Sequence, residues 1–231
     1  MTITFITGAN KGLGRETARR LVAQGHTVLV GARDPEAGAA VAAELGARFV
    51  AIDVTDDASV AAAAADVERH EGRVDVLINN AGVHGPMGDP GDLTGAEISA
   101  VLDVNLVGVV RATTAFLPLL RRSADPVIIN VSSSMGSLAA THDPGRAESK
   151  VVAPAYTSSK AALTMLTTQY AKALPGIRIN AADPGYTATD LNGNSGPQTV
   201  TEGTDAVVGL ATEGPGHGSG RFVDRDGEIA W

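Results

Sequence analysis

The sequence of 231 residues contains no cysteine, and only 3% of its residues are aromatic. Without cysteine the chain can form no disulfide, no thiol nucleophile and no Cys-ligated metal site, and this suits a reducing compartment. With so few aromatic residues, the core has to be built mainly from valine, isoleucine, leucine and alanine. Basic residues number 18 against 26 acidic ones, so the net charge of −8 argues against nucleic acid or an anionic membrane as the main partner.

A targeting or membrane segment is also missing. No apolar run approaches the length that spans a membrane, and the first residues lack the basic and apolar regions of a signal peptide. We therefore expect a soluble, cytoplasmic protein. His26, His70 and His217 are scattered without the spacing of a metal site, so we predict no metal. No stretch rich in Pro, Gly or Ser divides the chain, and we interpret residues 1–231 as a single domain.

What the sequence does contain is an alternation of short β-rich runs with longer helical stretches. The predicted strands are Ile3–Thr7, Thr27–Gly31, Arg48–Ile52, Val74–Asn79, Pro126–Ser132, Ile177–Ala182 and Gly220–Val223. The predicted helices are Leu13–Gln24, Pro35–Leu45, Ala58–Glu71, Gly95–Arg121, Pro154–Leu174 and Thr201–Thr212. Several strands are nearly continuous apolar runs, as in parallel strands covered on both faces. The repeated β–α units predict a doubly wound α/β sheet with right-handed crossovers.

The first predicted strand leads into a glycine-rich turn, Thr7–Gly14, and then into a helix. Gly8, Gly12 and Gly14 allow a tight turn and a close approach of the backbone to a diphosphate, and the helix N-terminus supplies amide donors. The spacing differs from the usual G-x-G-x-x-G pattern. Its place between a strand and an amphipathic helix nevertheless favours phosphate binding over an ordinary strand–helix connection.

The end of the second predicted strand indicates which dinucleotide would bind. An acidic residue there would bind the ribose hydroxyls of NAD, whereas a basic one suits a 2′-phosphate. Arg33 stands at this point and Lys11 lies in the glycine-rich turn, so we predict NADP(H) in preference to NAD(H); the alternative is that Arg33 is a solvated loop charge. Asp34, before a proline, is interpreted as a helix cap. Asp53 either accepts the adenine amino group or begins a turn, and Asn79–Gly82 lets the backbone approach a ribose while its Asn side chains bridge strands.

Tyr156 and Lys160 stand four residues apart in a predicted helix, so they share one face of it. A free phenol has a pKa of about 10 and is a poor proton donor or acceptor near neutral pH. A neighbouring ammonium would lower this pKa towards the range useful for general acid/base catalysis. A solvated helix face can carry the same pair, so the other motifs have to decide between the two interpretations.

Together these motifs resemble the short-chain dehydrogenase/reductase family over essentially the whole chain. The matching segments are Thr7–Gly14, Asp53, Asn79–Gly82, Asn105, Ser132-Ser133, Tyr156 with Lys160, and Pro184-Gly185. Within that family, the segments 9–12 and 32–34 look like the NADPH-dependent carbonyl reductase branch. The resemblance implies a Rossmann-like domain with a parallel seven-stranded sheet and helices on both faces. Its cofactor half would span about residues 1–130 and its catalytic half residues 131–231.

The resemblance also implies an activity, an NADP(H)-dependent transfer of hydride between nicotinamide and a ketone, aldehyde or quinone, or the corresponding alcohol. The implied catalytic residues are Asn105, Ser133, Tyr156 and Lys160, with Ser134 as the alternative to Ser133. Tyr156 would donate the proton, Ser133 would hydrogen-bond the carbonyl, Lys160 would bind the nicotinamide ribose and lower the phenol pKa, and Asn105 would hold a relay water. The implied cofactor-binding residues are Gly8, Asn10, Lys11, Gly12, Leu13, Gly14, Arg33, Asp53, Val54, Asn79, Ala81, Gly82, Tyr156, Lys160, Pro184, Gly185, Thr187 and Thr189.

Three segments around this site set further expectations. Ser133 and Tyr156 are separated by more residues than is common in the family, and we predict that 137–153 forms a loop with a short helix at the mouth of the site. Such an insertion leaves both a homo-oligomer and a monomer open. The short, Gly-rich stretch 192–197 predicts an open site, and His84 is interpreted as a solvated loop histidine, with contact to a small-molecule substrate as the alternative. Two other functions stay open: a non-catalytic NADP-binding regulator, and an epimerase or dehydratase on the same fold.

Overall fold

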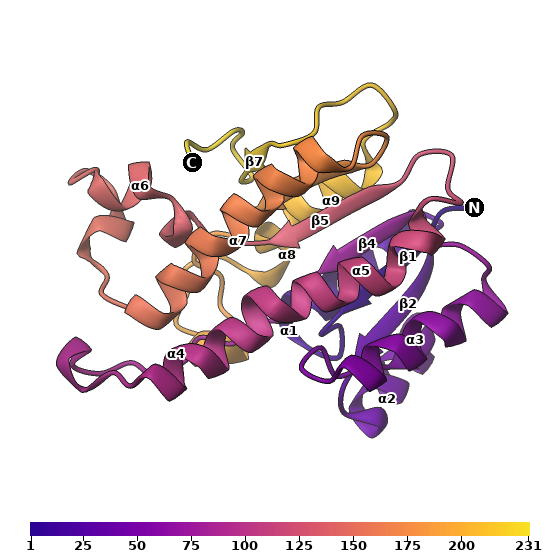
Figure 1. The fold of residues 1–231 in the computed structure, drawn as a ribbon, viewed down its shortest axis with the longest axis horizontal. Coiled ribbons are helices and arrows are strands. Elements are labelled where there is room, and N and C mark those ends of the chain that lie inside the picture. The colour runs from indigo at the N-terminus through magenta and orange to yellow at the C-terminus, as the bar shows by residue number, and fades with distance from the viewer.

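Seven parallel strands form one sheet in the computed structural model, which describes residues 1–231 (Figure 1). The strand order is β3-β2-β1-β4-β5-β6-β7. The strands are β1 (Ile3–Thr7), β2 (Thr27–Ala32), β3 (Arg48–Ala51), β4 (Val76–Asn79), β5 (Val127–Val131), β6 (Arg178–Ala182) and β7 (Phe222–Val223). The principal helices are α1 (Gly12–Ala23), α2 (Pro35–Leu45), α3 (Asp57–His70), α4 (Gly95–Leu102), α5 (Gly108–Leu120), α6 (Leu138–His142), α7 (Pro154–Ala173), α8 (Val200–Gly203) and α9 (Asp205–Thr212). The predicted doubly wound α/β fold is therefore confirmed.

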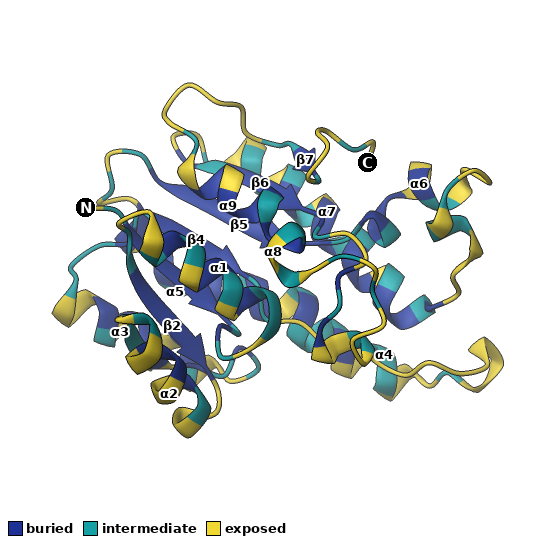
Figure 2. Cartoon of the chain, turned by 180° about the vertical axis from the view of Figure 1, so that it is seen from behind, coloured by how far each residue is buried: buried dark blue, intermediate teal, exposed yellow.

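Helices cover both faces of the sheet. On one face α3, α5 and α7 lie across the strands (Figure 1), and on the other lie α1, α2 and α9 (Figure 2). Successive residues of β2 alternate between the two resulting cores, because strand side chains point to opposite faces in turn: Val28 and Val30 belong to one core and Leu29 to the other. With both faces buried, the strands have to be apolar along their whole length, and this explains the continuous apolar runs.

The region predicted as one helix, Gly95–Arg121, is helical but changes its helix type in the middle. α4 passes through a π-helical segment, Asp103–Val107, before α5 begins. The continuous helical stretch Gly95–Leu120 is 26 residues long and is apolar enough, by length and composition, to cross a membrane, so the expectation that no such run exists was wrong. Within the fold this stretch buries Phe116 against the sheet, and Arg111 pairs with Asp103. The core helix of a folded domain passes the same test of length and composition.

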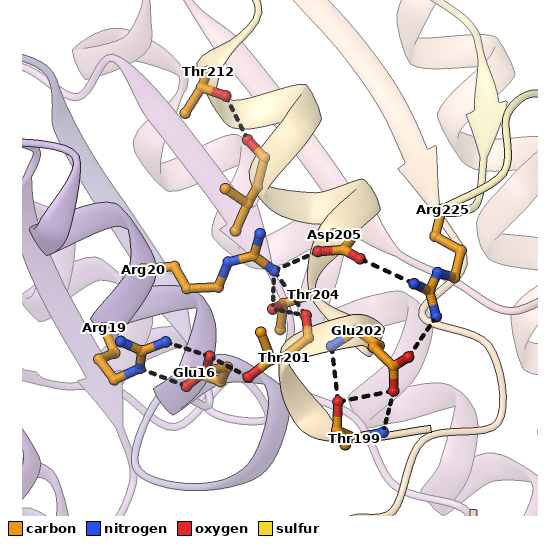
Figure 3. A network of polar contacts seen from close by, with 11 residues as sticks. Glu16, Arg19, Arg20, Thr199, Thr201, Glu202, Thr204, Asp205, Thr212 and Arg225 are labelled. Atoms are coloured by element: carbon orange, nitrogen blue, oxygen red, sulfur yellow. Dashed lines mark hydrogen bonds and ion pairs between the residues drawn. The ribbon is translucent and has the colours of Figure 1, made fainter. Parts of the chain in front are cut away.

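Hydrogen bonds join the C-terminal helices α8 and α9 to α1, the helix that follows the glycine-rich turn. Arg20 of α1 donates from Nη1 to the carbonyl oxygen of Thr201 at 2.7 Å, to Thr204 Oγ1 at 2.8 Å and to Asp205 Oδ1 at 2.8 Å (Figure 3). Arg225 extends this network by pairing with Asp205 and with Glu202. The first and last parts of the chain thus form one framework around the sheet.

The chain order of the strands reverses between β1 and β4. In open α/β sheets the crevice beyond the carboxyl ends of the strands at such a switch point is where ligands bind. The structure therefore directs attention to the segments that follow Thr7 and Asn79.

Candidate active site

A cavity of about 520 Å³ opens at this switch point. Of the predicted cofactor-binding residues, all line it except Asn79, Gly185 and Thr187. Asn79 is buried and donates instead to Asn130 Oδ1 of β5 at 2.9 Å and to Thr113 Oγ1 at 3.3 Å. Its side chain bridges neighbouring strands, as expected, and is not turned to the cavity because its Nδ2 donates to these core partners.

The glycine-rich turn packs directly against the segment after β4. Asn80 Nδ2 donates to the carbonyl oxygens of Thr7 at 2.9 Å and Gly8 at 3.0 Å. A Cβ on Gly14 would lie 2.5 Å from both Asn80 Nδ2 and the Gly8 carbonyl oxygen, so this close approach requires glycine. No side chain caps the start of α1, and its first amides are left to a ligand. These features fit a bound dinucleotide diphosphate.

At the end of the cavity where the adenosine is expected, Arg33 and Lys11 both belong to the lining. Asp34 caps α2, since its carboxylate accepts hydrogen bonds from the amides of Glu36 and Ala37, and it does not compete for a ribose. Asp53 Oδ1 accepts from Thr55 Oγ1 at 2.7 Å and from the Thr55 amide at 2.9 Å. The hydrogen bond from the Thr55 side chain lowers the pKa of Asp53. Asp53 therefore begins a turn, and it also belongs to the lining of the cavity.

At the end of the cavity where the nicotinamide is expected, Tyr156 and Lys160 lie on the buried face of α7, with 9% and 6% of their surface exposed. This excludes the solvated helix face. Lys160 Nζ lies 5.6 Å from the centre of the Tyr156 ring and donates to the Val131 carbonyl oxygen at 2.8 Å. Burial lowers the pKa of Lys160 to about 8, opposed by the charge of Asp183.

The phenol behaves differently from the sequence-based expectation. Burial, helped by the charge of Asp183, raises the pKa of Tyr156 to about 12, and a hydrogen bond with Ser133 lowers it only in part. The protein side chains alone thus keep Tyr156 protonated at neutral pH instead of moving its pKa downward. A protonated phenol is equipped to donate a proton.

The two candidate serines face different partners. Ser133 lies close enough to the Tyr156 phenol to lower its pKa in part. Ser134 is buried near Asp183 and Glu148, and the Arg146 pair, helped by Ser134, lowers the pKa of Glu148 to about 2. Only Ser133 is therefore in contact with the reactive phenol.

Asn105 stands in the π-helical segment and joins two parts of the site. Its Oδ1 accepts from the Val83 amide at 2.8 Å, while its Nδ2 donates to the Val83 carbonyl at 2.9 Å and to Ser159 Oγ of α7 at 2.9 Å. Both amide protons of its side chain are used in this way. Asn105 is a clamp between the segment after β4 and the helix that carries Tyr156.

The segment after β6 lines one side of the cavity. Thr189 lines it, but the Thr187 hydroxyl donates to the Pro184 carbonyl at 2.8 Å and lies outside the lining. Gly185 is outside too, because its amide donates to Asp183 Oδ1 at 2.9 Å within a turn. The stretch 192–197 is held by Asn192, whose Nδ2 donates to the Thr187 carbonyl at 2.8 Å.

Sequence reasoning missed two residues. Asp183, only 5% exposed, was not singled out, although a carboxylate between an apolar strand and Pro184 is an unusual choice that signals a special environment. His84 was interpreted as a solvated loop residue, and this was wrong: its ring is stacked on Tyr156. Nothing in the local pattern distinguishes it, because the contact depends on the fold.

The insertion contains α6 and a single 3-10 turn, Ala147–Lys150, in agreement with the predicted loop and short helix. Ser137 Oγ donates to the Ala230 carbonyl at 2.6 Å, and Trp231 packs on Phe222 with ring centres 5.3 Å apart. The C-terminus therefore supports the base of the insertion.

Comparison with known proteins agrees with this geometry. A family model described as short chain dehydrogenase matches residues 2–199. The short-chain dehydrogenase anuI of Penicillium roqueforti is 35% identical, with 99% of this chain and 97% of that protein covered. The (-)-isopiperitenone reductase of Mentha piperita is 31% identical over 98% of this chain and 97% of its own length. Among solved structures, NADPH-bound carbonyl reductase from chicken fatty liver is 29% identical with a TM-score of 0.89, and each chain is covered to 100%.

Proposed function

The chain belongs to the short-chain dehydrogenase family, and we propose that it reduces a ketone, aldehyde or quinone with NADP(H) in preference to NAD(H). Membership makes it a nicotinamide-dependent oxidoreductase of carbonyl and alcohol groups. The observation that carries the proposal is that Tyr156 and Lys160 are buried and line the cavity together, with the half-buried Ser133 beside the phenol.

These residues suit carbonyl reduction. When bound, the nicotinamide supplies the hydride that reduces the carbonyl carbon. Ser133 and Tyr156 hydrogen-bond the carbonyl oxygen and stabilise the negative charge that develops on it. Tyr156 gives its proton to this oxygen, and the neighbouring ammonium of Lys160 stabilises the phenolate that remains.

Charge at the opposite end supports the preference for NADP(H). Arg33 and Lys11 line the adenosine side of the cavity, where Lys11 Nζ lies 3.5 Å from Asp190 Oδ2, while Asp34, next to Arg33 in the sequence, is engaged as a helix cap. A 2′-phosphate would gain two cationic partners there. The carbonyl reductase from chicken fatty liver has NADPH bound. We assign the cofactor half to about residues 1–130 and the catalytic half to residues 131–231.

The remaining attributes are proposed from the composition and net charge of the chain. We propose a cytoplasmic enzyme with a small-molecule substrate and with neither nucleic acid nor membrane as a partner. The insertion 137–153 leads directly into α7, and the mass in solution distinguishes a monomer from a homo-oligomer.

The test is NADPH oxidation over a panel of ketones, aldehydes and quinones with the wild type and Tyr156→Phe. Tyr156→Phe should lose more than about 99% of turnover while it still binds NADPH, because the phenol supplies the proton. Tyr170→Phe is the matched control on the same helix, since Tyr170 packs against the sheet far from the reactive residues. A Tyr156→Phe variant with normal turnover would disprove the mechanism. NADPH binding without turnover of any carbonyl by the wild type would favour the non-catalytic regulator.

A further inference from the structure

His84 and Tyr156 form an aromatic pair at the edge of the cavity. Their ring centres are 4.6 Å apart and their planes differ by 6°. This distance lies at the short end of the range of about 4.5–7 Å for interacting aromatic rings, and it exceeds the contact distance of stacked carbon atoms, so the rings are offset. His84 also lines the cavity together with Tyr156 and Lys160.

The backbone around His84 is fixed on both sides. Before it, both polar atoms of the Val83 backbone are bonded to the Asn105 side chain, which also holds Ser159 of α7. After it, Gly85 has a φ of +79°, and a Cβ there would lie 2.5 Å from Val101 Cγ2 of α4. His84 is therefore presented to Tyr156 by a built framework, in which Asn105 ties the two partners to each other.

The His84 imidazole contacts Tyr156 through the face of its ring and not through a nitrogen atom. His84 Nδ1 is shielded from solvent and has no hydrogen-bond partner, so no polar contact at this atom orients the ring. The stacked face is the part of the side chain that touches the reactive residue.

We propose that His84 is a positioning residue that holds the Tyr156 ring in the orientation for proton transfer. Ser133 lies near the Tyr156 hydroxyl, and Lys160 Nζ lies 5.6 Å from the centre of the Tyr156 ring. The stacked imidazole restricts rotation of the Tyr156 side chain. It thereby keeps the phenol hydroxyl directed at the carbonyl. The inference rests on the proposed reductase activity, since it concerns the proton donor of that reaction.

The same stack keeps water from the phenol. Besides burial, the groups that shift the pKa of Tyr156 are Asp183 after β6 and Ser133 after β5; Lys160 on the same helix lies 5.6 Å from the ring centre, and His84 after β4 covers the ring. Burial is the main cause of the raised pKa of Tyr156. Loss of the covering ring should therefore make the phenol more accessible to solvent and reagents.

The experiment compares His84→Ala, which removes the ring, with His84→Phe, which keeps an aromatic face and removes both nitrogens. We expect His84→Ala to lower kcat by about 10- to 100-fold, as for a misplaced reactive group, with an unchanged NADPH dissociation constant, and His84→Phe to restore most of the turnover. Acetylation of Tyr156 by N-acetylimidazole, followed by mass spectrometry, should be faster in His84→Ala than in the wild type or His84→Phe. His142→Ala is the matched control, because the ring of His142 contacts only the exposed helix α6.

Two results would overturn the proposal. A His84→Ala variant with wild-type kcat and acetylation rate would show that the stack positions nothing. A His84→Phe variant as impaired as His84→Ala, with both folded and binding NADPH, would assign the role to an imidazole nitrogen. Failure of the reductase function itself is recognised separately, as absence of turnover in the wild type; the acetylation rates would then still report on the stack.

Discussion

Lys160 donates a 2.8 Å hydrogen bond from Nζ to the carbonyl oxygen of Val131, the last residue of β5. This bond fixes the ammonium between the helix that carries Tyr156 and the strand that leads to Ser133. Burial lowers the pKa of Lys160 to about 8, and the nearby charge of Asp183 acts in the opposite direction. The charge of the site therefore changes within the range in which the enzyme can be assayed.

Carbonyl reduction should decline as the pH rises past about 8. Lys160 carries its charge below its pKa of about 8 and loses it above, whereas Tyr156, with a pKa of about 12, stays protonated throughout. Because the lost charge is the one that stabilises the phenolate, kcat/KM should fall on the alkaline side. The measurement is kcat/KM for the carbonyl substrate against pH.

Asp183→Asn should move this alkaline limb to lower pH. The Asp183 charge raises the pKa values of both Lys160 and Tyr156, and asparagine removes that charge with little change in shape. The same pH profile, recorded for the variant with saturating NADPH, checks the shift. A limb that stays in place would mean that Asp183 carries no charge in the working enzyme, and a limb at higher pH would contradict the electrostatic assignment.

Separate alanine substitutions should distinguish the two serines. Ser133→Ala removes the group that hydrogen-bonds Tyr156 and should lower kcat by about 100-fold or more, the typical cost of one lost oxyanion donor. Ser134→Ala leaves the phenol untouched but removes a partner of buried Asp183 and of Glu148, so its main effect should be a lower melting temperature. Steady-state kinetics and thermal unfolding of both variants provide the check. A larger loss of kcat in Ser134→Ala would reverse the assignment.

The fold was predictable from the sequence because its signals are local. Continuous apolar strands, Asp34 before a proline and the glycine-rich turn each specify their own segment, and the structure places them within a few residues of expectation. Asp183 and His84 could not be interpreted in this way. Their properties come from burial and stacking against residues distant in the chain, and the π-helical segment around Asn105 likewise has no local signature.

Arg33→Ala should weaken NADPH much more than NADH. Arg33 lines the adenosine side of the cavity, and loss of one charge-assisted contact to a 2′-phosphate corresponds to about a 10- to 100-fold rise in the KM for NADPH. Kinetics with both cofactors make the comparison. Arg15→Ala is the control, since Arg15 pairs with Glu44 on the outer surface. Equal effects on NADPH and NADH would remove the assignment of Arg33 to the phosphate.

Arg20→Ala should destabilise the fold without touching the reactive residues. The Arg20 guanidinium joins α1 to the Thr201 carbonyl and to Thr204 and Asp205 (Figure 3), so the substitution leaves several acceptors at the junction of the two chain ends without their donor. Because Asp205 is partly solvated, we expect a loss of about 1–2 kcal/mol in the free energy of unfolding, below the upper value for buried charged hydrogen bonds. Urea unfolding measures it. Arg19→Ala, on the same helix, removes the pair between the exposed Arg19 and Glu16, which keeps its hydrogen bond from Thr201, and should lower stability less than Arg20→Ala. If the two variants had the same free energy of unfolding, the C-terminal helices would be held by their apolar contacts with the sheet. The Arg20 hydrogen bonds would then contribute nothing measurable to stability.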